Sequence, residues 1–315
     1  MSNAPPQNTN RAYAAAHFAL ELDGKDSVGL FRSIEGGSIR ADVMTYQNGA
    51  NYDRWRQLGK PKFEDIKVQV GMSMSKPFYD WIAKFFKGTA DRKTGSIVAA
   101  DFYYKERARR EFSNAMIKEL TFPKLDGSDK NPAYMTVGMA VEDIVFKKGS
   151  GATLETPKGF ESQKLWTACN FMFRLDGFEP SCTRVAKIDS FTVKQNVIEY
   201  HMGGARAPIK TPSQIDFPNL VFYVPEADAQ PFYDQVAKRV VSGEVPGRLS
   251  GMLQTFDNDR RPLFTLSFSG VDILGASPDR SDATSEEIKM AKIEIYTESM
   301  TFDYSALDDA AGAKL

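Results

Sequence analysis

The chain contains 315 residues, with 40 basic side chains against 41 acidic ones and a formal net charge of −1. This balance gives no overall attraction to nucleic acid or to anionic membranes, and no segment approaches the roughly eighteen apolar residues of a membrane-spanning helix. Residues 1–10 are polar and lack the apolar core of a signal peptide, so we expect a protein made in the cytoplasm, without membrane insertion or specific nucleic-acid binding.

The chain repeats itself at a nearly constant distance. Residues 18–24 read FALELDG and residues 171–177 read FMFRLDG, an offset of 153 positions. The sequence PFYD at 77–80 returns at 231–234, an offset of 154. Chance matches would scatter, so this offset indicates one unit used twice. The predicted segments are a flexible arm (1–15), a first domain (16–147), a linker (148–167), a second domain (168–304) and a C-terminal tail (305–315).

The first half of each copy is predicted to be a strand, a turn and a returning strand. Residues 39–46 alternate apolar and polar side chains with the two-residue period of a strand. Asn48 and Gly49 supply a turn, residues 53–62 form a polar interruption, and residues 66–72 alternate again. The second copy repeats this pattern in residues 191–197, 201–204 and 220–224.

One amphipathic helix is predicted next in each copy. Ser75 can cap it, Pro77 suits its first turn and Gly88 ends it. Aromatic and apolar residues between them recur every three or four positions, which indicates a face packed against a sheet. The second copy repeats this between Pro231 and Gly243.

The remaining strands complete the predicted fold class. The expected hairpins are residues 97–104 with 112–120 around a charged turn at 105–110, and residues 249–256 with 263–274 around a turn at 257–261. A last strand is expected at 135–146 and at 293–302, where Glu142 and Phe146 return as Glu298 and Phe302 at an offset of 156. The sequence therefore predicts a mainly β protein with two tandem small antiparallel β-barrel or sandwich domains, each with one flanking α-helix.

No catalytic constellation is recognisable. Serine-hydrolase, zinc-protease, Walker-type and dinucleotide motifs are absent from the sequence. The two cysteines, Cys169 and Cys182, lack a metal-ligand spacing and are interpreted as buried or half-buried thiols. Aspartates at 126–129 and 257–259 lie in turns, where they normally cap backbone donors; a weak calcium site is the alternative. We predict no enzyme activity, no cofactor and no metal.

Long strands with unblocked edges point to association. Residues 38–47 and 62–72 are long for so small a domain, and glycine and asparagine lie near their tips. Exposed strand edges invite pairing with another chain. The basic run at 105–110 is interpreted as a solvated hairpin tip or a salt-bridge partner at a protein interface.

These features resemble the tail tube protein family of contractile phage tails and phage-tail-like contractile injection systems. The resemblance lies in the Leu-Asp-Gly motif that ends residues 18–24 and 171–177, in strands that end in Tyr-x-x-Gly, and in the helices that begin with PFYD. It covers roughly residues 16–147 and 168–304. Ordinary tube subunits resemble a single copy, whereas this chain carries two.

The resemblance implies a structural protein whose rings of six domains surround a lumen. Three chains in one plane would supply one ring of six domains, whereas six chains would supply two stacked rings. The roles of main tube, tube initiator and hub all remain open. The implied partners are further copies of this chain, other tube, baseplate or spike proteins, the sheath, and cargo in the lumen of a particle assembled in the bacterial cytoplasm. The alternative is a non-tube baseplate or cargo adapter.

The long hairpins are the expected inter-subunit and lumen-lining surfaces. Their strands are expected at 38–47 with 62–72 and at 189–200 with 219–224, with either face directed inward. The candidate residues are Ser38, Arg40, Asp42, Tyr46, Asn48, Gly49, Lys67, Gln69, Thr192, Lys194, Asn196, Tyr200, Gly203 and Gly204.

Overall fold

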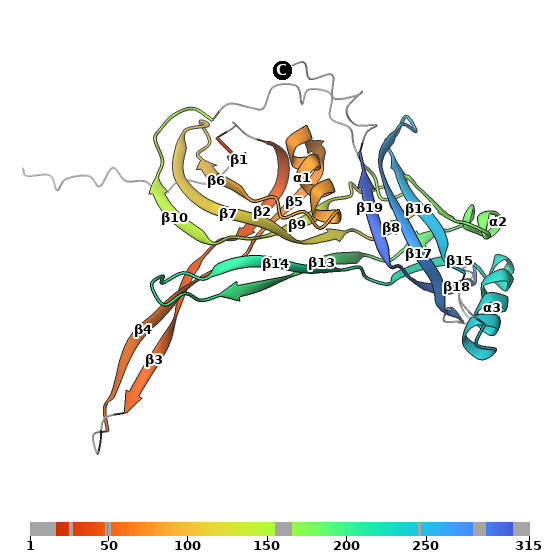
Figure 1. The fold of residues 1–315 in the computed structure, drawn as a ribbon. Helices are drawn as coiled ribbons and strands as arrows, with labels where there is room; N and C mark the ends of the chain where they lie inside the picture. The colour runs from red at the N-terminus through yellow and green to blue at the C-terminus, as the bar shows by residue number, and fades with distance from the viewer. Residues whose placement is uncertain are drawn as a thin grey trace, which may run out of the picture.

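The computed structural model describes residues 17–24, 28–47, 49, 52–154, 166–244, 247–279 and 288–304 of the chain. Within these residues the fold is mainly β, and the two copies repeat one order of elements (Figure 1). The predicted fold class is confirmed.

The first copy contains a short strand, four longer strands, one helix and then five further strands. Its elements are β1 (His17–Leu22), β2 (Gly29–Gly36), β3 (Ile39–Gln47), β4 (Arg54–Phe63), β5 (Ile66–Met74), α1 (Lys76–Phe86), β6 (Lys93–Ala100), β7 (Glu106–Phe122), β8 (Leu125–Asp126), β9 (Met135–Ala140) and β10 (Asp143–Lys148).

The second copy follows the same plan with some short additions. Its elements are β11 (Phe171–Leu175), α2 (Glu179–Cys182), β12 (Lys187–Ile188), β13 (Phe191–Tyr200), β14 (Ile209–Asp216), β15 (Leu220–Pro225), the 3-10 turn Glu226–Asp228, α3 (Gln230–Val236), the π-helical turn Ala237–Val241, β16 (Leu249–Phe256), β17 (Pro262–Pro278), β18 (Met290–Tyr296) and β19 (Ser299–Asp303).

Equivalent strands occupy equivalent places in two large antiparallel sheets. One runs in the order β1-β6-β7-β9-β5-β2 with β10 on β7, and the other runs β11-β16-β17-β18-β15-β12 with β19 on β17. The duplication read from the sequence is therefore also a duplication of strand order.

The helix α1 packs as its apolar spacing predicts. Phe78, Trp81 and Ile82 are buried, as are the two phenylalanines that end the helix. Ser75 stands at the N-cap position, but its hydroxyl makes no capping hydrogen bond. Among the described residues, no helix is both long and apolar enough to cross a membrane.

Three expected boundaries are wrong. The polar residues 53–62 are not an interruption, because Arg54–Phe63 forms β4 and pairs with β3. The basic run at 105–110 is not a turn, because β7 begins at Glu106. The last strand of each copy is divided in two, as β9 with β10 and as β18 with β19.

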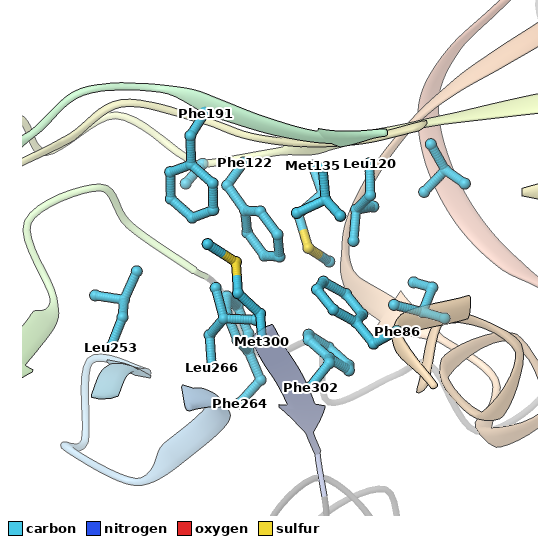
Figure 2. Close-up of a cluster of buried hydrophobic side chains, with 14 of the residues drawn as sticks. Phe86, Leu120, Phe122, Met135, Phe191, Leu253, Phe264, Leu266, Met300 and Phe302 are labelled. Atoms are coloured by element: carbon cyan, nitrogen blue, oxygen red, sulfur yellow. The ribbon is translucent and has the colours of Figure 1, made fainter. Parts of the chain in front are cut away.

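The two copies share one hydrophobic core. Phe122 of β7 stacks on Phe191 of β13 with ring centroids 4.9 Å apart, and Phe86 of α1 stacks on Phe302 of β19 at 6.0 Å. Figure 2 shows these rings meeting with Phe264 of the second copy. Burial of these aromatic side chains stabilises the contact between the two copies.

Candidate assembly surface

The hairpins β3–β4 and β13–β14 are the same unit in the two copies. Ala41 pairs with Pro61 and Val43 with Leu58 in the first hairpin, with a bulge between these pairs. The second hairpin repeats both pairs and the bulge at positions exactly one repeat later in the chain, between Gln195 and Val197. Because a bulge and its register persist, the geometry of the hairpin has been kept while most of its side chains have changed.

The second hairpin lies against the first copy and continues its sheet. β13 pairs antiparallel with β7, with Thr192 opposite Thr121 and Val193 opposite Leu120. The two threonine hydroxyls are 2.9 Å apart. We call this contact, where β13–β14 of the second copy meets the first copy, the internal junction.

A charged pair of the first copy holds the backbone of β14 at the internal junction. Arg92 Nη1 lies 2.7 Å from Glu142 Oε1. The backbone N–H of Lys210 donates to Glu142 Oε1 at 2.8 Å, and Arg92 Nη2 donates to the Lys210 carbonyl oxygen at 2.6 Å. Both backbone groups of one residue are thus satisfied by one ion pair, and charge-assisted hydrogen bonds of this type are among the stronger ones.

The first hairpin has no comparable cover. Every residue of β3 is exposed, and in Figure 1 β3 and β4 project away from both sheets. It carries large exposed apolar side chains, whereas soluble surfaces normally show these only singly. They are Ile39, Val43, Met44, Tyr46, Tyr52, Trp55 and Leu58.

The predicted site residues of the second hairpin share one face. Along β13 the side chains of Val193 and Gln195 are buried, whereas Lys194 and Asn196, which alternate with them, are exposed. Thr192 and Tyr200 belong to the same alternation as the exposed pair. This face is opposite the buried side chains of Val193 and Gln195, and Gly203 and Gly204 lie in the loop that follows β13.

The predicted residues of the first copy divide between two places. Ser38 and Arg40 precede or begin β3, Asp42 forms an ion pair with Lys62 at 2.7 Å, and Tyr46 is exposed near the tip. Gly49, with φ +57°, stands in the turn, and Asn48 lies outside the described residues.

Lys67 and Gln69 do not belong to the hairpin. They lie on β5, which pairs with β2 and β9, and Lys67 is paired with Glu119 at 2.8 Å. The expectation that 62–72 is the partner strand of 38–47 is wrong, and the same holds for 219–224 in the second copy, since β4 and β14 take these places.

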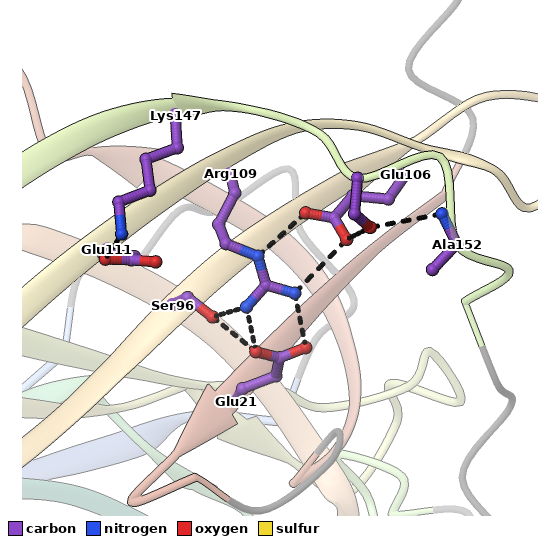
Figure 3. A network of polar contacts seen from close by, with 8 residues as sticks. Glu21, Ser96, Glu106, Arg109, Glu111, Lys147 and Ala152 are labelled. Carbon is purple, nitrogen blue, oxygen red and sulfur yellow. Dashed lines mark hydrogen bonds and ion pairs between the residues drawn. The ribbon is translucent and has the colours of Figure 1, made fainter.

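Side chains of the basic run are engaged within the first copy (Figure 3). Arg109 Nε donates to Glu106 Oε1 at 2.8 Å, and its Nη atoms bind Glu21. Ser150 Oγ donates to the second oxygen of Glu106 at 2.7 Å. The Arg109 guanidinium, followed by Ser150, lowers the pKa of Glu106. This cluster fastens residues that follow β10 to the start of β7.

The aspartate turns and the cysteines have local roles. Asp126 accepts hydrogen bonds from the backbone and hydroxyl of Ser128, and Lys124 with these bonds lowers its pKa to about 2. No three His, Cys, Asp or Glu side chains within the described ranges are grouped to hold a metal ion. Cys182 is buried and Cys169 half-buried, as interpreted from the sequence, and burial raises the pKa of Cys182 to about 11.

The sequence interpretation missed the residues that hold the internal junction. Arg92 and Lys210 belong to no motif, and their partnership joins positions far apart in the chain. Glu142 was visible as one of the repeated positions, with Glu298 as its counterpart. That repeated acid was a signal that the sequence offered, as was Arg248 at the position equivalent to Arg92.

Comparison with known proteins agrees with the resemblance. Residues 14–145 match the family model of the T4-like virus tail tube protein gp19. The search of curated proteins found no match.

Several solved structures show partial similarity to this chain. A chain of the PVC extracellular contractile injection system, in its extended sheath-tube complex, is 18% identical with a TM-score of 0.40, and the match covers 44% of this chain and 94% of that one. A chain of the anti-feeding prophage cap is 18% identical with a TM-score of 0.39, over 44% and 94%. The Hcp1 protein of E. coli EAEC 042 is 16% identical with a TM-score of 0.26, over 43% and 91%.

Proposed function

Because this chain belongs to the T4-like tail tube protein family through residues 14–145 and repeats the fold of that domain once, we propose that it forms a ring around a lumen. As a member of that family it is a structural component of a contractile tail or injection particle. The ring would be part of the inner tube or of its end near the baseplate. Its partners would be further copies of this chain, neighbouring tube, baseplate or spike proteins, and the sheath.

The pairing of β13 with β7 is the observation that carries this proposal. It joins two tube-like domains laterally into one sheet, a contact that neighbouring domains of a ring could repeat. A lateral junction within one chain favours three chains in one plane over six chains with their domains stacked. When the same head-to-tail contact repeats from chain to chain and the rotations add up to a full turn, the chains close into a ring.

The exposed face of the long hairpins is the proposed lumen surface. Thr192, Lys194 and Asn196 lie on the face of β13 opposite the buried Val193 and Gln195. Ser38 and Arg40 hold the corresponding positions in the first copy. The polar side chains at the start of each strand would limit adhesion of cargo. Tyr46 and Tyr200 place exposed aromatic rings farther along the same faces.

Negative-stain microscopy with light scattering of the purified full chain tests the proposal. Rings with a central hole and a mass about three times the 35.1 kDa of one chain are expected. A mass of six chains in two-layered particles would contradict the planar trimer. A chain that stays monomeric at every concentration would contradict ring formation and support the adapter alternative.

A further inference from the structure

We propose that the second copy carries an unoccupied duplicate of the internal junction, and that its occupant is the β3–β4 hairpin of a second copy of this chain. The proposal rests on the proposed ring and specifies the strand, the register and the residues by which the ring is joined. Each chain presents one acceptor, on β17, and one donor, on β3–β4.

The acceptor is the free edge of β17 at residues 275–278. These residues are the counterparts of residues 119–122 of β7, whose two edges pair with β9 and with β13. Within the described residues, the corresponding stretch of β17 pairs only with β18. The edge that β13 occupies in the first copy is therefore open in the second, and an open edge can accept a further strand.

The donor is the start of β3, and the repeat fixes its register. Applying the internal pairing to the neighbouring chain places Ser38 opposite Ser277 and Ile39 opposite Ala276. The hydroxyl pair of Thr192 with Thr121 is thus matched by a second pair of hydroxyls. Ile39, which is 42% exposed, gains an apolar neighbour.

The ion pair that holds β14 also has a duplicate. Arg248 and Glu298 are the counterparts of Arg92 and Glu142, each 156 positions later in the chain. Arg248 Nη1 lies 3.9 Å from Glu298 Oε2, and both side chains are exposed. The counterpart of Lys210 is Arg56 on β4, which is exposed. In the register given above, the backbone of Arg56 from the next chain falls between Arg248 and Glu298.

Exposed apolar residues agree with the same docking. At the internal junction Phe302 is only 6% exposed and stacks on Phe86. Its counterpart Phe146 is 57% exposed, and the counterpart of Phe86 is Val240, which is 60% exposed. Docking would bury Phe146 against Val240 and remove both from water.

Near this contact, a hydrogen bond between the two copies of one chain has an oppositely charged pair as its equivalent between chains. Tyr304 donates its hydroxyl to Asp80 across the internal junction. The counterparts are Lys148 and Asp234, both exposed. Opposite charges at matched positions favour this pairing between chains.

Cross-linking of the full chain tests the register. Ser38→Cys is combined with Ser277→Cys in a Cys169→Ser background, while buried Cys182 is kept because its raised pKa leaves little thiolate. A short bismaleimide should give at least about tenfold more interchain product than either single-cysteine variant. Directly opposed residues have Cβ atoms roughly 5 Å apart, within reach of such a reagent. The products should end at three chains.

The matched control moves one cysteine along the same strand. Ser267 is also exposed on β17, but β16 and β19 occupy its two edges, so Ser38→Cys with Ser267→Cys should not cross-link above background. Rings seen by microscopy without the Ser38–Ser277 product would overturn this register and leave the ring intact. Cross-linked open chains without rings would uphold the register and overturn the ring. Neither rings nor product would overturn both.

Discussion

Phe302 and Phe146 hold the same position in the two copies but have different surroundings. Phe302 lies in the shared core, whereas Phe146 is exposed on β10. We expect Phe302→Ala to lower the free energy of unfolding by about 3–5 kcal/mol, because it leaves a cavity, and Phe146→Ala to lower that of the dilute monomer by less than about 1 kcal/mol. Urea unfolding of both variants measures the difference. Equal losses would contradict the described core.

Glu106 gives the first copy a predictable response to acid. Its pKa in the folded chain is lowered, chiefly by Arg109, so its contribution to stability is complete above its unfolded pKa and is lost as pH falls through the folded value. Glu106→Gln should cost about 1–3 kcal/mol at neutral pH and less at pH 3. Unfolding curves at both pH values measure this. Glu111→Gln, which removes the exposed ion pair with Lys147, is the control and should cost below about 1 kcal/mol. A loss for Glu106→Gln that does not change with pH would contradict the role of its charge.

Single residues also show where sequence reasoning reaches its limit. The buried stripe of α1 could be predicted because helical spacing alone determines which side chains share a face. The bonds of Arg109 to Glu21 and Glu106 could not be predicted, because a run of charges in a sequence does not reveal which charges fold back on their own domain.

At the scale of elements, the two hairpins should respond differently to removal. Replacing residues 41–61 with an Asn-Gly turn should leave the circular dichroism and melting temperature of the monomer nearly unchanged, because this hairpin is exposed on both faces. It should weaken association in sedimentation, because it removes Arg56, whose backbone the proposed contact with Arg248 and Glu298 requires, while Ser38 and Ile39 stay in place.

The equivalent replacement of residues 195–215 is the matched control. It should destabilise the monomer by several kcal/mol, since the loss removes the buried Gln195 and Lys210 and leaves Arg92 and Glu142 without the backbone they bind. If the first replacement unfolded the chain and the second did not, the assignment of the two hairpins would be reversed.

The missed strand β4 shows why the exposed hairpin was only half predicted. No residue of Arg54–Phe63 is buried in the single chain. A strand is recognised in a sequence when apolar residues alternate with polar ones along a buried face, and β4 has no such face. The equivalent strand of the second copy, β14, was not predicted either. The repeat offset, by contrast, predicted both halves of the fold because it depends on no burial at all.

For the whole molecule, the shared core predicts one unfolding unit. α1 of the first copy packs on β19 of the second, and β13 extends the sheet of the first. Calorimetry of the dilute monomer should show a single transition whose van't Hoff and calorimetric enthalpies agree. Two separated transitions would mean that the copies fold independently and that the internal junction is weak.

Covalent duplication changes how such a particle begins to form. Of six lateral contacts in a ring of three chains, three would already exist, one inside each chain, held at the high effective concentration that a tether provides. Dilution therefore cannot separate these three contacts, and a ring would form through two encounters between chains instead of the five that six separate domains would need. The loss of translational and rotational freedom on assembly is correspondingly smaller, so the proposed ring should form at a lower chain concentration than a ring of six separate domains.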